Sequence, residues 1–158
     1  MLNTLTTFEK LMQDHEVIRA NLRQIAGIVD NLSTISSLQD GSGELTYHQI
    51  SYLSDKRVNL KRAISSLREG LIVHHQREEE AIQYLVGTSL LGAIKKEHQS
   101  IVEQAAEIDW MLLNISPAGI LFNSVFLKQK VDNLCQTLEA ICLRENSILE
   151  LLIKIPVN

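Results

Sequence analysis

Apolar residues recur with helical spacing through four long segments of this 158-residue chain. Their positions follow i, i+3, i+4 and i+7, which gathers them on one face of each helix. Only two prolines are present, Pro117 and Pro156, so helices can run without interruption for long stretches. Amphipathic helices with mostly short connections predict an all-α, antiparallel up-down-up-down four-helix bundle. The four segments are about 6–29, 53–85, 88–113 and 121–154.

Local signals indicate where these helices begin and end. Thr6 and Glu9 have the spacing of a capping box for the first helix. Gly87 is suited to close the second helix, and Thr88 or Ser89 to cap the third.

The segment 33–54 is polar and contains Gly41 and Gly43, which interrupt a helix. The sequence leaves two alternatives open here. The second helix could begin as early as Leu45, or a short extra helix could lie between the first and second helices and cover one end of the bundle.

Composition limits the class of protein. The length favours a single domain spanning 1–158, and 45% hydrophobic with 22% charged residues is ordinary for a soluble globular chain. A net charge of −4 gives no reason to expect nucleic acid or an anionic membrane surface as a partner. The first residues show no signal peptide, and no run is long enough to span a membrane, so the cytoplasm is expected. Cys135 and Cys142 suit a reducing compartment and predict buried thiols.

Polar residues interrupt the apolar face of every helix. Each lies about 7–11 residues from the same end of the bundle, which at about 1.5 Å per residue agrees within one turn. We therefore expect them to meet in one layer near that end. They are His15 in the first segment, His74 and Glu78 in the second, His98 in the third and Glu145 in the fourth.

Three imidazoles and two carboxylates in an apolar core need a compensating charge. Burying a carboxylate without a partner costs several kcal/mol, and a divalent or trivalent metal ion supplies the missing charge. His74 and Glu78 lie four residues apart, so both face the same side of a helix. Imidazole combined with carboxylate suits iron, manganese or zinc. The pattern predicts a metal site, while each histidine taken alone could equally be a hydrogen-bonded core residue.

The stretches around these residues resemble the hemerythrin-like (HHE cation-binding) family over nearly the whole chain. They read "DHEVIR" around His15, "HHQREEEAIQYL" from His74, "KKEHQSIV" around His98 and "RENSILELL" around Glu145. The resemblance implies that His15 and His74 hold one iron, that Glu78 and Glu145 bridge to a second, and that His98 belongs to the second. It also implies reversible binding of O₂ or NO, sensing of these molecules, or iron handling.

Two positions depart from the family pattern. Ile141 stands where the family usually has a histidine four residues before the last carboxylate, and Val102 stands where some members have a second histidine on helix three. The second metal position is thus expected to be weak, open or empty, giving a mononuclear or asymmetric centre, or a centre that has lost its metal. Cys142 neighbours Ile141 but is rotated about 100° around the helix, so it is not expected to replace the missing ligand.

The remaining polar residues of these segments are expected to be peripheral. We predict that Glu79 and Glu80 face solvent, and that His75 flanks the site or faces outward. An alternative register that turns His75 and Glu79 inward fits the leucine row less well. His48 has no inward partner that the sequence identifies.

No nucleophile paired with a base and no phosphate-binding loop is evident, so we do not expect an enzyme, although a weak oxidase or peroxidase-like side activity stays open. The first hypothesis is a non-haem metal-binding protein for a small diatomic ligand, O₂ or NO. The alternative is a metal-depleted structural or regulatory bundle that acts through protein–protein interaction. The sequence leaves monomer and homodimer open.

Overall fold

The computed structural model describes residues 4–38 and 46–154, and these form four long helices, one short helix and no strand. This confirms the predicted all-α bundle. The helices are α1 (Thr4–Leu38), α2 (Tyr47–Ile82), α3 (Thr88–Asn114), α4 (Pro117–Phe122) and α5 (Ser124–Ile153).

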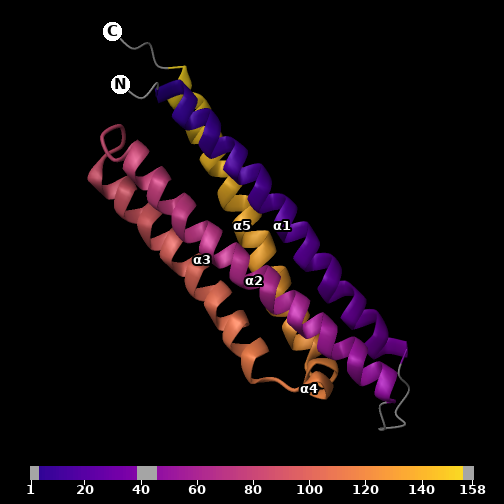
Figure 1. Cartoon of the computed structure of the whole chain (residues 1–158). Helices are drawn as coiled ribbons and strands as arrows, with labels where there is room; N and C mark the ends of the chain where they lie inside the picture. The colour runs from indigo at the N-terminus through magenta and orange to yellow at the C-terminus, as the bar shows by residue number, and fades with distance from the viewer. Residues whose placement is uncertain (1–3, 39–45, 155–158) are drawn as a thin grey trace.

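The four long helices pack as an elongated antiparallel bundle (Figure 1). Helix α1 contacts both α2 and α5, and α3 contacts the same two helices from the other side. The start of α1, the end of α5 and the connection between α2 and α3 lie at one end of the bundle, and α4 lies at the opposite end (Figure 1). Residues near the start of α1 and near the end of α2 therefore lie at the same level.

Side-chain caps begin α2 and α4. Thr46 and Gln49 form a capping box, in which the Thr46 hydroxyl accepts from the Gln49 N–H at 3.2 Å and the Gln49 side chain accepts from the Thr46 N–H at 2.8 Å. Ser116 caps α4 by accepting from the Gly119 N–H at 2.9 Å, with Pro117 in the first turn. A Cβ at Gly119 would lie 3.0 Å from the Ser116 hydroxyl, so this cap requires a residue without a side chain.

Several predicted helix ends differ from the structure. Helix α1 already includes Thr4, so Thr6 lies inside it and the expected capping box with Glu9 is wrong. Helix α2 ends at Ile82, and Gly87 is the N-cap of α3 rather than the closing residue of α2. Hydrophobic periodicity fixes the middle of a helix better than its ends, because the last turn depends on local hydrogen bonds.

The short extra helix of the described chain is α4, between α3 and α5. Of the two alternatives for 33–54, the structure agrees with an early start of the second helix, because α2 begins at Tyr47, and residues 33–38 continue α1. The part of this segment from 39 to 45 lies outside the described residues. A separate α4 forms because Ser116 and Pro117 start it and Asn123, at φ −103° and ψ 14°, interrupts the path into α5.

The apolar core divides into two clusters along the bundle axis. The large cluster fills the long part of the bundle, with fully buried residues such as Leu60, Ile64 and Leu134. The small cluster closes the end where α1 begins, and its buried members are Phe8, Leu11, Ile82, Ile94 and Leu149. Leu85, the last residue of the second predicted segment, is 49% exposed because α2 has already ended.

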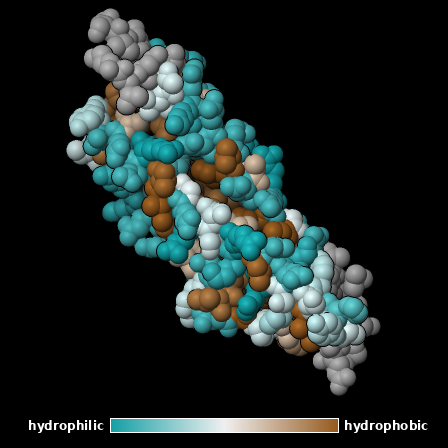
Figure 2. Space-filling model, viewed as in Figure 1, coloured by the Kyte–Doolittle hydropathy of each residue, from teal (hydrophilic) through white to brown (hydrophobic). Residues whose placement is uncertain are grey.

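The face drawn in Figure 2 is mostly hydrophilic, with apolar patches between the polar residues. Such scattered apolar surface is normal for a folded chain in water. In the described part of the chain, no helix has both the length and the apolar composition that a membrane span requires.

Truncation of Leu60 tests the large cluster. Leu60 is fully buried, so Leu60→Ala should lower the free energy of unfolding of chelator-treated protein by about 3 kcal/mol through lost burial and an unfilled cavity. Urea unfolding followed by the helical circular dichroism signal measures it. Leu113→Ala is the control, because Leu113 is 64% exposed and its loss should change stability by less than about 0.5 kcal/mol. Equal losses in both variants would contradict the described packing.

Candidate metal centre

A layer of polar side chains separates the two apolar clusters. On α1, for example, His15 lies between Leu11 of the small cluster and Ile18 of the large one. The same alternation occurs on α2, α3 and α5, because each long helix contributes apolar residues to both clusters. All five residues singled out in the sequence are in this layer, and none is more than 4% exposed: His15, His74, Glu78, His98 and Glu145.

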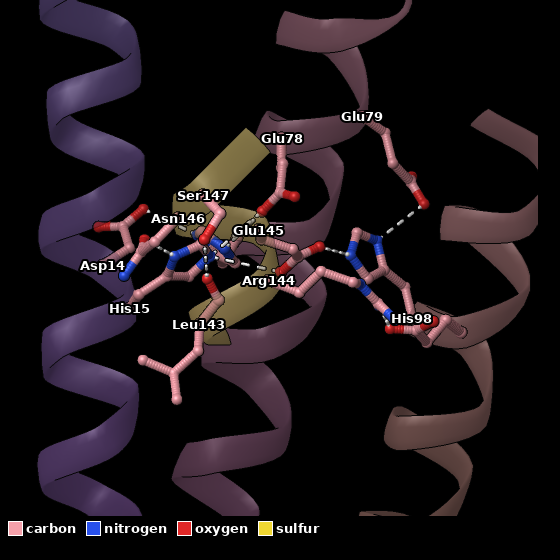
Figure 3. A network of polar contacts seen from close by, with 12 residues as sticks. Asp14, His15, Glu78, Glu79, His98, Leu143, Arg144, Glu145, Asn146 and Ser147 are labelled. Atoms are coloured by element: carbon pink, nitrogen blue, oxygen red, sulfur yellow. Dashed lines mark hydrogen bonds and ion pairs between the residues drawn. The ribbon is translucent and has the colours of Figure 1, made fainter. Parts of the chain in front are cut away.

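The two carboxylates lie between histidines of different helices (Figure 3). Glu145 Oε1 is 3.4 Å from His15 Nε2, and Glu145 Oε2 is 2.7 Å from His98 Nε2. Glu78 Oε2 is 3.3 Å from His15 Nε2 and 3.0 Å from His74 Nε2. His15 thus faces both carboxylates at once, while His74 faces Glu78 and His98 faces Glu145.

The outer nitrogen of each histidine is held by a polar partner. His15 Nδ1 donates to the Asn146 side-chain oxygen at 2.6 Å, and His74 Nδ1 donates to Asp14 at 3.1 Å. His98 Nδ1 donates to Glu79 Oε1 at 3.2 Å, a contact drawn in Figure 3. All three rings therefore turn Nε2 inward. An oxygen acceptor on one ring nitrogen with the other facing inward is the usual arrangement of metal-ligating histidines.

The electrostatics of the layer favour an ionised Glu78 and raise the pKa of two histidines. Burial alone would lower the pKa of His15, but Glu145, Glu78 and Asn146 outweigh it and raise the pKa to about 10. Burial likewise opposes ionisation of Glu78, yet His15 and His74 hold its pKa well below the usual range. The pKa of His98 is raised by Glu145 against the effect of burial. The raised pKa values of His15 and His98 favour protonated rings, which offset negative charge in the layer.

Among the described residues, one buried imidazole nitrogen lacks a hydrogen bond. His74 Nε2 is buried and has no hydrogen-bond partner, although Glu78 Oε2 lies only 3.0 Å away. The contact with Glu78 lacks hydrogen-bond geometry, whereas a cation among these atoms would coordinate this nitrogen. Ligand atoms of His15, His74, Glu78 and Glu145 all lie within 4.8 Å of one another. These four residues fit a divalent cation, and His98 adjoins the group through Glu145.

Two neighbours of the candidate ligands on α2 are at least half-buried: His75 agrees with the first of its two predicted alternatives, and Glu79 differs from its prediction. His75 flanks the site but does not face outward, since it is 5% exposed and its ring stacks on His98 at 3.8 Å with an interplanar angle of 3°. Burial, with His98 and His74 nearby, lowers the pKa of His75 to about 3, so its ring is neutral. Glu79 is half-buried and holds His98, whereas Glu80 is exposed as predicted. His48 is exposed and contacts the ring of Tyr47.

The width of the buried face of α2 explains why His75 is buried and Glu79 is half-buried. Helix α2 packs against α1 on one side and α3 on the other. Successive residues are turned by about 100°, so His74 and His75 reach toward different neighbours. The sequence signal for a buried His75 was its position next to His74. A helix that packs against two neighbours can bury both members of such a pair.

The positions that depart from the family pattern form part of an apolar wall. Ile141 is 4% exposed within the large cluster, and Val102 packs against that cluster from α3. Cys142 is also buried there, and burial raises the pKa of its thiol to about 12. Its sulfur does not belong to the group of four candidate ligands. The side of the layer that faces the large cluster is therefore dry and offers no further ligand among these three residues.

Substitutions that remove or keep an aromatic ring at position 75 test whether the His75–His98 stack stabilises the fold. His75→Ala should lower the free energy of unfolding of chelator-treated protein by about 2 kcal/mol, because it leaves a gap against His98. His75→Phe keeps an aromatic face there and should lose less than about 1 kcal/mol. Urea unfolding measures both, with exposed His48→Ala as the matched control. Equal losses for the Ala and Phe variants would show that a ring nitrogen, not stacking, is what matters.

Comparison with known proteins agrees with this geometry. No curated protein and no solved structure matches the chain significantly. The sequence model of the hemerythrin HHE cation-binding domain matches residues 6–150, a range that contains the whole polar layer and all but the ends of the chain. The chain therefore belongs to the hemerythrin HHE cation-binding domain family.

Proposed function

We propose that this protein binds non-haem iron in the polar layer and uses it to bind or sense O₂ or NO, with iron handling as the related role. The observation that carries the proposal is the convergence of three inward Nε2 atoms and two carboxylates in a buried layer. The family implies a cation, and the buried His74 Nε2 without a hydrogen bond supports the same conclusion from this chain.

We assign the first metal position to His15, His74, Glu78 and Glu145. Their mutual proximity supports this assignment. Glu145 would also reach a second position beside His98, because its two oxygens already face different histidines. The second position has only one imidazole of its own. We therefore propose an asymmetric centre in which the first position binds metal more tightly than the second.

Iron, when bound, would supply an open coordination position that a neutral diatomic molecule can occupy. The chain's own residues determine the surroundings of that position. Asp14, Asn146 and Glu79 fix the planes of the three rings, which keeps Nε2 of each ring directed inward. The two apolar clusters cover the layer from above and below along the bundle axis.

We propose binding rather than catalytic turnover, with weak oxidase or peroxidase-like chemistry as a side activity at most. Cys135 and Cys142 are free in the structure, which suits a reducing compartment, and we propose the cytoplasm. Manganese or zinc would fit the same imidazole and carboxylate atoms.

One observation favours the alternative of a metal-depleted structural or regulatory bundle. Ile141 fills its position with a well-packed apolar side chain in the large cluster, where the family usually has a histidine. In that case, proton sharing between the histidines and carboxylates would hold the layer together, and function would pass to a protein partner. Metal content separates this alternative from the iron-binding proposal.

Metal content and stability should fall together when a ligand is removed. His74→Ala should lower both metal per chain and the thermal midpoint, because metal binding is coupled to folding. Glu80→Gln is the matched control, since Glu80 is exposed on the same helix. Elemental analysis and thermal unfolding measure the two quantities.

Two results would contradict iron binding. Less than about a tenth of a metal ion per chain, after expression in iron-replete medium, would favour the metal-depleted alternative. A gain in stability for Glu78→Gln without a change in metal content would show that the layer is only a buried charge defect.

Ligand binding should be visible in spectra. Protein loaded anaerobically with Fe²⁺ should develop new absorption in the visible range on addition of NO, because the ligand binds an iron whose remaining positions are filled by imidazole and carboxylate. Protein loaded with Zn²⁺ is the control and should not change. An unchanged spectrum for the iron protein, with iron content confirmed, would exclude NO as the ligand.

A further inference from the structure

A groove runs between α1 and α2 beside the polar layer. Its volume is about 430 Å³, and the residues lining it include Asp14, Val17, Gly70, Val73 and His74. His74 is the only one of the five layer residues that reaches it. A second cavity of about 570 Å³ shares Asn21 and Ser66 with the groove, so the two adjoin along the α1–α2 seam.

Gly70 keeps part of this groove open. It lies in the interior of α2, where glycine is unfavourable compared with alanine, and it lines the groove. A Cβ built at Gly70 would meet no atom within 4 Å. A side chain at this position would therefore enter free space without a clash, and a large one would occupy the groove.

The groove connects solvent to the layer through Asp14. The Asp14 side chain is 25% exposed and accepts the hydrogen bond from Nδ1 of His74, which is 4% exposed. Arg77 lies 3.8 Å from the same carboxylate oxygen and is itself 53% exposed, so a cation could displace it at little cost. Asp14 and Glu69 place two carboxylates against one guanidinium in the groove lining, which favours an arriving cation.

On the side between α2 and α3, the layer is covered by a pair of stacked rings. There, Glu79 is 24% exposed and holds His98, but the His75 ring lies flat against the His98 ring at 3.8 Å. These stacked rings come from α2 and α3 and cover His98 on that side. Access to the layer is therefore unequal on its two sides.

We propose that the α1–α2 groove is the route by which a divalent cation enters the layer, with Asp14 as its first contact and the His15–His74 position as the first to fill. The inference rests on the proposed metal binding. Bulk in the groove should then slow metal uptake without changing the amount of metal bound at equilibrium.

The experiment mixes chelator-treated protein with Co²⁺ alone and follows its visible absorption by stopped flow. Gly70→Leu should slow uptake by about tenfold, because the cation must wait for the groove to open. Gly70→Ala tests helix stabilisation without filling the groove and should change the rate little. Gly92→Leu is the matched control, because Gly92 is an exposed glycine of α3 whose Cβ would also meet no atom within 4 Å.

The outcomes separate this inference from the proposed function. Slow uptake in Gly70→Leu alone, with wild-type metal content at equilibrium and unchanged helical circular dichroism, supports the groove as the route. Equal rates in wild type and Gly70→Leu overturn the route while leaving metal binding intact. Equally slow uptake in Gly70→Ala and Gly70→Leu also overturns it, because entry would then follow local unfolding of α2. A wild-type protein that binds no Co²⁺ and no iron contradicts the proposed function itself.

Discussion

The structure depends on how two carboxylates are accommodated between two apolar clusters. Glu78 and Glu145 are each less than 5% exposed, and a buried carboxylate without partners would destabilise the fold by several kcal/mol. Three imidazoles from α1, α2 and α3 provide that compensation. The bundle geometry follows from this need, because only helices that keep these residues level can bring the compensating groups together.

The outer partners of the histidines give the layer its rigidity. Asp14 and Asn146 are adjacent in sequence to His15 and Glu145, yet each supports a histidine on another helix. The layer thereby cross-links α1 to α2 and α1 to α5 at the level where the apolar core is interrupted. Because a single ring rotation would break an inner and an outer contact together, the inward direction of Nε2 is held from both sides.

The two sides of the layer are chemically different. Toward α1, two histidines share the carboxylates and a groove adjoins them; toward α3, a single inward histidine is covered by the neutral ring of His75. Ile141 and Val102 add apolar bulk on the α5 and α3 positions where the family carries further ligands. This asymmetry supports the proposed centre with a strong and a weak position.

The sequence by itself determined the four long helices and the five polar residues of the layer. The 3.6-residue period of the apolar residues, and the number of residues between each polar residue and its helix end, can both be counted along the chain. It misplaced helix ends and the extra helix, which depend on single caps such as Ser116. Only the tertiary structure decided that His75 and Glu79 turn inward and that Asp14 and Asn146 hold the rings. The physical reason is that the width of a helix's buried face is set by the neighbours it packs against, and periodicity along one helix does not contain that information.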